Sequence, residues 1–599
     1  MKRFWQDLIR RLNLPNKEEV KKSLKSLSKR EYAVFIVSFL VLLTSTVIII
    51  SKINKNFIVE IPTWGGEIRE GVIGTPRFIN PLLQFSDTDK DLTALVYSGL
   101  MRREPNGSLT ADLAERYEIS KDGLSYTVTL KENIVFHDKE PVTADDVIFT
   151  IERVKDNLIK SPKKINWDGV TVLKLDERRV EFNLKQPYAS FLDNLTLGIM
   201  PYHVWKDISR DQWNFSNLNI EAVGSGPYKI SEIKKKSGIP RSYELTAFKN
   251  YVDGKPFVRK ITFKFYDNED GLVKALLADK VDQISSISPE NALRLESAGY
   301  HVETAVLPRI FGLFFNQNQA PLFTDKAVIK AIGEAINKER IIEEVLRGYG
   351  ISVDSPLPSS LIEYASFKAS DKKLEAGSIE EANKTLDEAG WKIGEDGIRE
   401  KDKITKIEAK LAKSKTAPKK EVSRLEFSIS TSDIPELKRA AEMIQEDLAK
   451  IGAKVELRVF ETGALNQNVI QPRKYDALFF GQVINHESDL FAFWHSSQRS
   501  DPGLNIALYT NAKVDKLLES ILVTLDKKER AKKYLEFQEE ISKDVPAVFV
   551  YSPYFIYISQ KNPKGLNINN LKGASDRFLG ISNWYLKTDS IWKVFSASK

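Results

Sequence analysis

Four side chains that could bind a metal ion lie close together in the last quarter of the chain. They are His486, Glu487, Asp489 and His495, which could supply imidazole nitrogens and carboxylate oxygens. A group of this kind is more often part of a solvated loop. We therefore favour the loop interpretation and keep metal or metal-chelate binding as an alternative.

No residue pattern predicts catalysis. The sequence contains no HExxH, GxSxG or Walker motif. Its histidines are scattered, at His137, His203, His301, His486 and His495. There is no cysteine, which excludes thiol catalysis, zinc–thiolate sites, disulfides and a lipid-modified N-terminal cysteine. We predict that the protein is not an enzyme and needs no cofactor.

Two other patterns have structural interpretations. Gly224 and Gly226 in VGSGPYK predict a tight turn before a strand, because no phosphate-loop pattern accompanies them. Thr143 is placed as a helix N-cap with Asp146 in the capping-box position. We therefore interpret Asp145 and Asp146 as a helix start rather than a catalytic pair.

The composition indicates a globular protein with more than one domain. A chain of 599 residues with 42% hydrophobic and 29% charged residues is too long for one compact core and too apolar to be disordered. Its net charge of +7 is concentrated in residues 1–31, which hold ten Lys and Arg against four Asp and Glu. The rest is nearly neutral, so we predict no binding to nucleic acid.

Tyr32–Ile50 is typical of a membrane-spanning helix. These 19 residues carry no charge, and at ~1.5 Å per residue a helix of that length spans the hydrocarbon core of a bilayer. The positive-inside rule then predicts a cytoplasmic tail at 1–31, an anchor at 32–51, and an extracellular or periplasmic remainder that begins with a linker at 52–64. A cleavable signal peptide is the alternative, but the apolar stretch is long and no small-x-small site follows it.

The basic tail has two interpretations. Trp5, Leu8, Ile9 and Leu12 recur at helical spacing, as in an amphipathic helix lying on anionic lipid. The favoured interpretation is a solvated tail whose lysines only set the topology.

Alternating and helical patterns predict an α/β fold for the outer part. Residues 425–460 give a strand, a helix that starts at Pro435, a stop at Gly452 and a second strand. This order and spacing predict a right-handed parallel crossover. We also predict a strand at Ser125–Val135, two helices within 324–348 with Asn337 capping the second, and an exposed lysine-rich insertion at 400–424.

Six segments occur in the order found in one known family. They are LVYSGL with the LTADLAERYE segment after it, VGSGPYKI, FGLFFNQNQAPLFTDKAVIKAIGEAINKERIIEEVLRGYG, LDEAGWKIGEDGI, KYDALFFGQ and FAFWHSS. From about Gly65 to about Leu586 the chain therefore resembles the ABC-transporter extracellular solute-binding proteins of family 5. Members of that family bind peptides, nickel chelates and some sugars.

The resemblance implies a two-lobed clamp of the periplasmic-binding-protein type II kind, with a hinge that the chain crosses twice. Lobe I would comprise 65–309 and a return segment at 554–599, and lobe II would comprise 310–553. Ligand would bind between the lobes and stabilise the closed form by contacting both. The implied partners are a peptide or similar small solute and ABC permease subunits, and the receptor would be monomeric.

The resemblance also implies which residues line the cleft. In chain order they are Ile79, Asn80 and Pro81 in an early turn, Gly481, Gln482, Val483 and Asn485 at a strand end, Phe493 and Trp494 beyond it, and Tyr551 at the return crossing. Core packing is an equal alternative for Phe493 and Trp494. Hinge packing is the alternative for Tyr551.

The chain departs from the family where peptide-binding members recognise a free amine. Those members have Gly-Trp and then an aspartate three residues after the Trp, whereas this chain has Gly481-Gln482 and Asn485. Asparagine carries no charge, so the charge-assisted part of amine recognition is lost unless Asp489 replaces it. A blocked or internal peptide segment, or an uncharged solute, fits better. A nickel chelate, an oligosaccharide, or a non-transport role as a sensor or surface chaperone remain alternatives.

Overall fold

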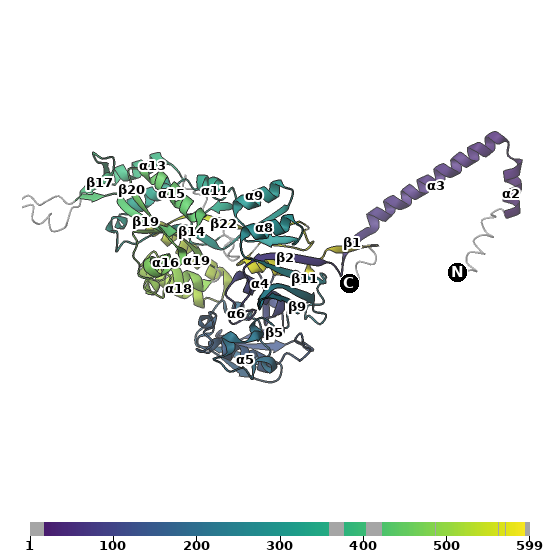
Figure 1. The fold of residues 1–599 in the computed structure, drawn as a ribbon, viewed down its shortest axis with the longest axis horizontal. Coiled ribbons are helices and arrows are strands. Elements are labelled where there is room, and N and C mark those ends of the chain that lie inside the picture. The colour runs from purple at the N-terminus through teal and green to yellow at the C-terminus, as the bar shows by residue number, and fades with distance from the viewer. Residues whose placement is uncertain are drawn as a thin grey trace, which may run out of the picture. The chain divides into compact units, whose positions relative to one another are not determined.

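A mixed β-sheet with helices on its faces forms the centre of the main body (Figure 1). The computed structural model describes residues 17–358, 377–402, 422–484, 487–560, 562–569 and 571–592. The chain forms two compact units, a body of Trp64–Leu586 and a smaller unit of Met1–Thr63 with Lys587–Lys599.

The smaller unit contains two helices and a two-stranded ribbon. The helices are α2 (Lys17–Ser26) and α3 (Lys29–Phe57), and the ribbon pairs β1 (Ile58–Thr63) antiparallel with β23 (Lys587–Trp592). The predicted linker at 52–64 is therefore wrong for most of its length, because α3 continues to Phe57 and the next six residues pair with a strand from the other end of the chain. That strand also removes the last residues of the predicted return segment from lobe I.

One helix in the described part of the chain is long and apolar enough to cross a membrane, at Lys29–Ile49. A signal sequence near the N-terminus would satisfy the same criterion. The candidate amphipathic positions Trp5, Leu8, Ile9 and Leu12 lie outside the described residues.

The sheet of the body contains parallel and antiparallel neighbours. Its strand order is β20 (Lys454–Phe460), β19 (Glu426–Ser432), β21 (Ala477–Val483), β14 (Arg309–Phe315), β22 (Ala547–Ser559), β12 (Gln283–Ser285), β2 (Glu67–Ile73), β11 (Lys260–Tyr266), β10 (Ile239–Ala247) and β9 (Tyr228–Lys236). Two further strands, β13 (His301–Val306) and β15 (Gly350–Ser352), also pair with β22.

The long strand β22 lies in the middle of this sheet and joins its two halves. Its first part pairs with β14, from Phe314 opposite Ala547 to Phe311 opposite Tyr551. Its second part pairs with β13, from Val306 opposite Tyr554 onward. The chain thus crosses between two halves of the body twice, at 306–309 and at 551–554, and the two crossings lie side by side.

The buried apolar residues form two sets, one on each side of these crossings. One group of clusters draws its buried members from 68–307 and 555–584, and the other draws them from 310–551. We call residues 64–306 with 554–586 lobe I and residues 309–551 lobe II. A two-lobed α/β body with a double crossing agrees with the expected architecture.

Lobe I adds smaller sheets and helices to its part of the main sheet. The sheets are β3 (Met101–Arg103) with β4 (Leu109–Ala111), and β5 (Ala114–Ile119), β6 (Ser125–Leu130), β8 (Arg179–Leu184) and β7 (Val170–Lys174). The main helices are α4 (Asp87–Val96), α5 (Ala144–Lys155), α8 (Glu269–Leu277) and α9 (Pro289–Ser297). The strand predicted at Ser125–Val135 is present but ends at Leu130.

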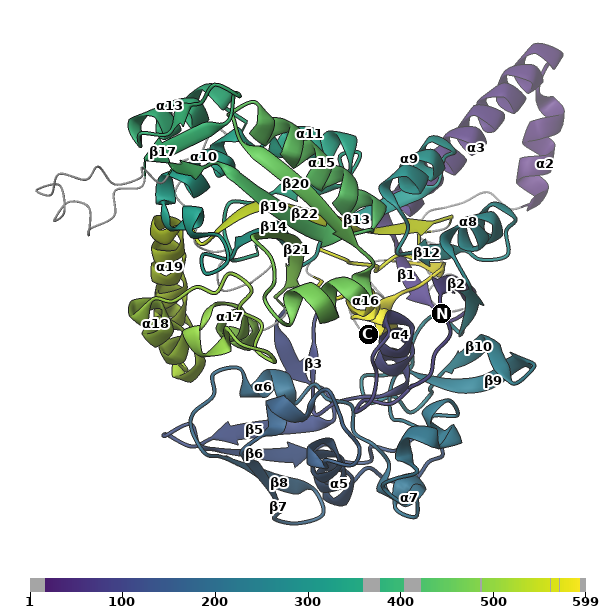
Figure 2. The ribbon, with the colours of Figure 1, turned by 60° about the vertical axis from the view of Figure 1, so that its left-hand side comes forward.

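The parallel strand–helix–strand order predicted for lobe II is confirmed, and its right-handedness stays a prediction. β19 and β20 are parallel and are joined by α15 (Pro435–Ala449), which buries its apolar face. The two helices expected within 324–348 are α10 (Lys326–Ala335) and α11 (Lys338–Glu344), and the Asn337 side chain accepts a hydrogen bond from the Arg340 amide. Figure 2 shows α11 and α15 beside β20, and α5 with its small sheet at the opposite end of the body. The other α-helices in the described residues of lobe II are α13 (Ile379–Glu388), α16 (Thr462–Leu465), α17 (Glu487–Trp494), α18 (Ala512–Val523) and α19 (Lys527–Asp544).

The predicted insertion at 400–424 has structured ends. β17 (Arg399–Asp402) pairs with β18 (Val422–Arg424) and with β16 (Lys392–Ile393), so the segment leaves and returns through a small antiparallel sheet. Residues 403–421 lie outside the described part of the chain.

Two local sequence signals in lobe I, the capping box at Thr143 and the glycines at 224 and 226, can be compared with the structure. Thr143 and Asp146 form the predicted capping box, in which the Thr143 amide donates to the Asp146 carboxylate at 2.8 Å. The segment with Gly224 and Gly226 leads into β9 (Tyr228–Lys236), as predicted, but neither glycine has a positive φ. A Cβ on Gly224 would lie 2.1 Å from the carbonyl oxygen of Val96, so glycine is needed because the end of α4 approaches this backbone closely.

Candidate ligand-binding site

Four of the predicted site residues meet beside the hinge. In β21, Gly481 lies opposite Phe311 and Val483 opposite Arg309, with Gln482 between them. On the other side of β14, Tyr551 of β22 also lies opposite Phe311. Three neighbouring strands therefore bring Gly481, Gln482, Val483 and Tyr551 together, although Tyr551 is distant from the others in sequence.

Phe311 is held between Gly481 and Tyr551. The Phe311 and Tyr551 rings stack with centroids 5.1 Å apart, and a Cβ on Gly481 would lie 2.6 Å from the Phe311 ring. Glycine at 481 therefore gives the Phe311 ring room beside β21. Tyr551 is 1% exposed, and burial raises the pKa of its hydroxyl well above the usual range. In this structure Tyr551 is a packed hinge residue, and its contact with a ligand stays a prediction.

Two hydrogen-bond donors near this strand end have no partner in the described residues. They are Nε2 of Gln482 and Nε1 of Trp494. Side chains alternate between the two faces of a strand, so Gln482 lies on the same face of β21 as Leu478, which packs in the cluster that contains Trp494. Gln482 is 4% exposed. Buried donors without partners are rare in folded proteins, so both groups can donate to a ligand or to water without losing an internal hydrogen bond.

The early turn, at Ile79–Pro81, comes after the carboxyl end of β2, a strand that has a parallel neighbour. Asn80 donates from Nδ2 to Asn219 Oδ1 at 2.9 Å and accepts from the Leu82 amide at 2.9 Å. Ile79 and Asn80 are fully buried, and Pro81 packs against Gly198. These contacts shape the turn, and ligand contact by its residues stays a prediction.

Helix α17 carries the next predicted pair. Trp494 is fully buried and its ring packs against Phe314, Tyr509 and Phe549. Phe493 is partly buried against the same cluster. Core packing, the alternative considered for both, describes the position of Trp494 here. Asn485 lies outside the described residues.

The candidate metal ligands are not assembled in the part of the chain that the structure covers. Within that part, no group of three or more His, Cys, Asp or Glu side chains is placed to hold a metal ion. His486 lies outside the described residues. His495 stacks on Phe491 with ring centroids 4.1 Å apart, and its Nε2 lies 3.5 Å from Glu519 Oε1.

Lys163 is a functional candidate that the sequence did not reveal. It lies in lobe I, where burial and then the charge of Lys90 lower the pKa of its ammonium, and the charge of Asp489 in lobe II opposes this shift. The two residues are more than 300 positions apart, and Lys163 is one of several lysines in an ordinary polar loop, so no local pattern could have indicated the pair.

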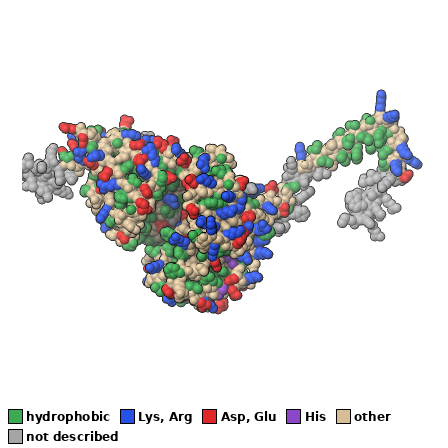
Figure 3. Space-filling view, viewed as in Figure 1, with side chains coloured by type: hydrophobic (Ala, Val, Ile, Leu, Met, Phe, Trp, Pro, Cys, Tyr) green, Lys and Arg blue, Asp and Glu red, His purple; other side chains and the backbone are tan. Residues whose placement is uncertain are grey.

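The lobes also touch at a point far from the hinge in sequence. The Ala189 amide of lobe I donates to the Leu522 carbonyl of lobe II at 2.8 Å. A Cβ on Gly123 would lie 2.7 Å from Cδ1 of Leu525, so these segments are in contact too. Figure 3 shows a hollow in the visible face of the body, between the part with α15–α19 and the part with β2 and α8. The site can therefore enclose a solute between two lobes that meet on both sides of it.

Comparison with known proteins gives consistent matches over this body. The model of a family described as bacterial extracellular solute-binding proteins, family 5 (middle), matches residues 108–502. The oligopeptide-binding protein AppA of Bacillus subtilis is 27% identical over 538 residues, which cover 88% of this chain and 92% of AppA.

Two solved structures share the fold along most of the chain. The structure of AppA from Bacillus subtilis in complex with a nonapeptide has a TM-score of 0.65 at 26% identity, and it covers 88% of this chain and 100% of AppA. The structure of NikZ from Campylobacter jejuni in complex with Ni(L-His) has a TM-score of 0.67 at 25% identity, and it covers 87% of this chain and 99% of NikZ.

Proposed function

The chain belongs to the bacterial extracellular solute-binding proteins of family 5, and from this premise we propose that it captures oligopeptides between its lobes and presents them to the permease of an ABC importer. The observation that carries this proposal is the double crossing at 306–309 and 551–554, beside which the predicted ligand-facing strand end lies. Binding would be reversible and would leave the solute chemically unchanged.

The geometry beside the hinge supports an extended ligand. Gly481–Val483 end a strand that reaches the crossing. This strand end offers backbone groups that can pair with the main chain of any peptide. The turn at Ile79–Pro81, which follows β2 of the other lobe, already uses its backbone groups internally, because the Ile79 amide donates to Asn219 and the Asn80 carbonyl accepts from Leu83 and Gln84. The relative AppA has been solved with a nonapeptide, which favours peptide over the other solutes bound within the family.

We expect this chain to differ from the peptide-binding members of the family in how it binds the N-terminal end of the peptide. Gln482 and Asn485 are both neutral amides, and Gln482 has an unpartnered donor. A neutral site gains little from an ammonium group but can hydrogen-bond an amide or acetyl oxygen. We therefore propose recognition of blocked or internal peptide segments rather than of free N-termini.

We propose that α3 remains as a membrane anchor, with the basic N-terminal residues in the cytoplasm and a monomeric receptor body outside the membrane. The span at Lys29–Ile49 is fully exposed in the structure, as a lipid-facing helix would be. The intact mass of the protein extracted from membranes tests this proposal, since a cleaved signal peptide would remove the whole span.

A matched pair of nonapeptides tests the ligand proposal. Titration calorimetry on the full chain in detergent should show stoichiometric binding, with the N-acetylated peptide bound at least as tightly as the same peptide with a free amine. Asn485→Asp should reverse the order and favour the free amine by about tenfold, since it restores a charge-assisted hydrogen bond.

Other outcomes would contradict the proposal. If the unmodified protein prefers the free amine by more than about tenfold, the neutral-end interpretation is wrong. Binding of nickel–histidine or of an oligosaccharide, without binding of either peptide, would place the chain with the other ligand classes. Hydrolysis of the peptide would show an enzyme.

A further inference from the structure

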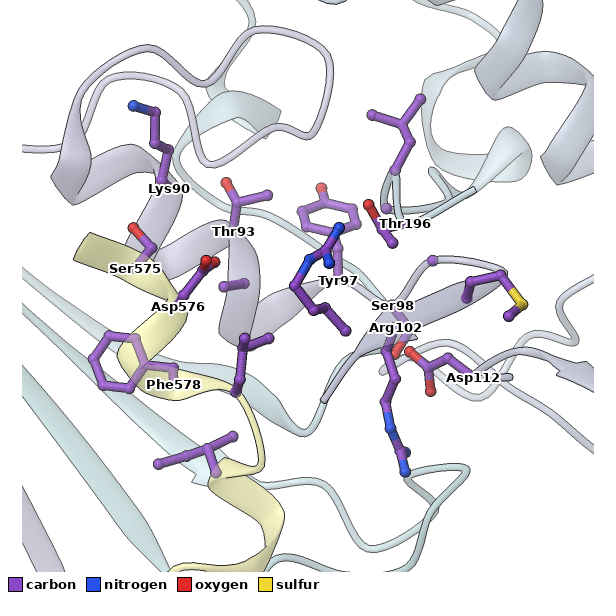
Figure 4. Close-up of a pocket in the computed structure, with 18 of the residues that line it drawn as sticks. Lys90, Thr93, Tyr97, Ser98, Arg102, Asp112, Thr196, Ser575, Asp576 and Phe578 are labelled. Carbon is purple, nitrogen blue, oxygen red and sulfur yellow. The ribbon is translucent and has the colours of Figure 1, made fainter. Parts of the chain in front are cut away.

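Lobe I contains a cavity of its own, with a volume of about 380 Å³. Its walls come from α4, the β3–β4 hairpin, the turn at 193–198 and the return segment at 573–583 (Figure 4). Of the described residues that line it, none lies between 254 and 572, so neither the hinge strands nor lobe II contribute. The cavity is therefore distinct from the strand end at Gly481–Val483 and from Tyr551, although Lys163, which interacts with the charge of Asp489 in lobe II, also lines it.

Four polar atoms on the cavity wall have no hydrogen-bond partner among the described residues. They are Oγ1 of Thr93, the hydroxyl of Tyr97, Oγ of Ser98 and Oδ1 of Asp112. Each of these residues is at most 5% exposed. Figure 4 shows the Tyr97 hydroxyl pointing into the space between Thr93 and Thr196, with Ser98 and Asp112 together at the other end. Ser98 and Asp112 are close enough for the Ser98 hydroxyl to oppose the rise in the pKa of Asp112, so they count as one polar region of the wall. Buried polar groups are normally satisfied, so this region together with the Tyr97 hydroxyl and Thr93 Oγ1 indicates a polar occupant.

The charges of the wall favour a cationic occupant. Six carboxylates and four cationic side chains line the cavity. Both arginines are already paired, Arg103 with Asp193, and Arg102 with Glu104 at 2.9 Å and Asp253 at 2.8 Å. Lys90 pairs with Asp87 at 3.4 Å, and Asp576 accepts from the Lys572 and Gly573 amides. Lys163 adds a positive charge to the same wall. Asp112 is the lining carboxylate with a buried oxygen that has no hydrogen-bond partner among the described residues. In the part of the chain that the structure covers, no cluster of three metal-ligating acids or histidines is present, so an organic cation fits better than a metal ion.

We propose that this cavity binds a small organic molecule with a primary ammonium group, which donates to Asp112, while Ser98, Tyr97 and Thr93 hydrogen-bond to the rest of the ligand. Burial raises the pKa of Asp112 to about 6, although Ser98 and Arg102 oppose the rise. A bound ammonium group stabilises the ionised carboxylate and offsets this desolvation. The site is independent of the peptide proposed for the hinge.

Calorimetric titration of the full chain with ethanolamine, putrescine and free lysine tests the proposal, with glucose as the neutral control. At least one amine should bind saturably in the millimolar range or tighter, and the three arms distinguish an amino alcohol, a diamine and an amino acid. Asp112→Asn should weaken that binding by about tenfold or more, because it removes the charge and keeps the shape. Tyr97→Phe should weaken it less, because it removes one neutral hydrogen bond.

Matched controls separate this site from the one beside the hinge. Gln482→Ala should leave amine binding unchanged, and Asp112→Asn should leave nonapeptide binding and the unfolding temperature of the ligand-free protein intact or higher. The proposal is overturned if no amine binds, if glucose binds as well as the amines, or if Asp112→Asn binds the amine as tightly as the unmodified protein. A crystal structure grown with the best amine that shows only ordered water on these four groups would also overturn it.

Discussion

At the residue scale, His137 is held as one neutral tautomer by the loop that contains Gly224 and Gly226. Its Nε2 lies 3.0 Å from the Gly226 carbonyl oxygen, and the Gly224 amide donates to Nδ1 at 3.4 Å. A carbonyl accepts and an amide donates, so the proton must be on Nε2. Burial lowers the pKa of His137 to about 4, with Lys229 adding to the shift and Asp138 opposing it.

This environment predicts a loss of stability in acid. A folded-state pKa of about 4, below the ordinary 6.5, means that the unfolded chain protonates first as the pH falls. The contribution of neutral His137 to the free energy of unfolding is complete above pH 6.5 and is lost as the pH falls toward 4. It amounts to about 3 kcal/mol at most. His137→Gln should therefore show a smaller decrease in the free energy of unfolding between pH 7.5 and pH 4.5, measured by urea denaturation.

An exposed histidine provides the control for this prediction. His301 is half exposed beside Glu303, so His301→Gln makes the same substitution without removing a buried imidazole. If His137→Gln and His301→Gln have the same pH profile, protonation of His137 does not contribute to acid unfolding.

At the element scale, a buried ion cluster attaches the return segment to lobe I. Arg577, in the short helix at Ala574–Phe578, contacts Asp91 of α4 through Nη1 at 2.8 Å and through Nη2 at 2.5 Å, and contacts Glu70 of β2 through Nη2 at 3.0 Å. Their side chains are at most 3% exposed. The Tyr557 hydroxyl lies 2.8 Å from the other Glu70 oxygen and 2.6 Å from Gln283 Oε1. The guanidinium group of Arg577 therefore joins β2, α4 and the return segment.

Removal of that guanidinium should be costly. Arg577→Met would leave two carboxylates buried and unpaired, and we expect a loss of about 3–5 kcal/mol in the free energy of unfolding. Denaturant unfolding of the full chain measures it. Arg179→Met breaks a half-exposed pair with Asp176 and should cost about 1 kcal/mol or less. Equal losses in the two variants would show that the buried cluster contributes no more than a surface ion pair.

The same elements show what a sequence can predict and what it cannot. The crossover at 425–460 and the capping box of Thr143 follow from signals within a few residues, and both are present. The contacts of Arg577 with Glu70 and Asp91 join residues more than 480 positions apart. No periodicity encodes such pairs, and the same is true of the pairing of β1 with β23. At the candidate site, the resemblance placed the strand end at Gly481–Val483, whereas the burial of Ile79, Asn80 and Trp494 depends on neighbours distant in sequence.

At the scale of the whole body, the two lobes are joined at the crossings and touch again at Ala189. The crossings contain Pro308 and Pro553, which have no amide hydrogen to donate to a neighbouring strand. Ser552 Oγ instead donates to the Leu307 carbonyl at 3.1 Å. The lobes have separate buried cores, so rotation about the crossings would leave those cores intact. Ligand that contacts both lobes should therefore favour the closed arrangement.

Cysteine pairs can report this closure, since the chain has no cysteine of its own. Ala189→Cys with Leu522→Cys places thiols on residues whose backbones are joined by a 2.8 Å hydrogen bond in this structure, where the two lobes touch. The nonapeptide should accelerate disulfide formation severalfold, measured by gel shift under mild oxidation, because it raises the closed population. The control pair Thr171→Cys with Asn183→Cys joins opposite residues of β7 and β8 within lobe I, so its rate should not respond to peptide. If the inter-lobe pair is equally insensitive to peptide, the lobes do not close on ligand and the clamp mechanism is wrong.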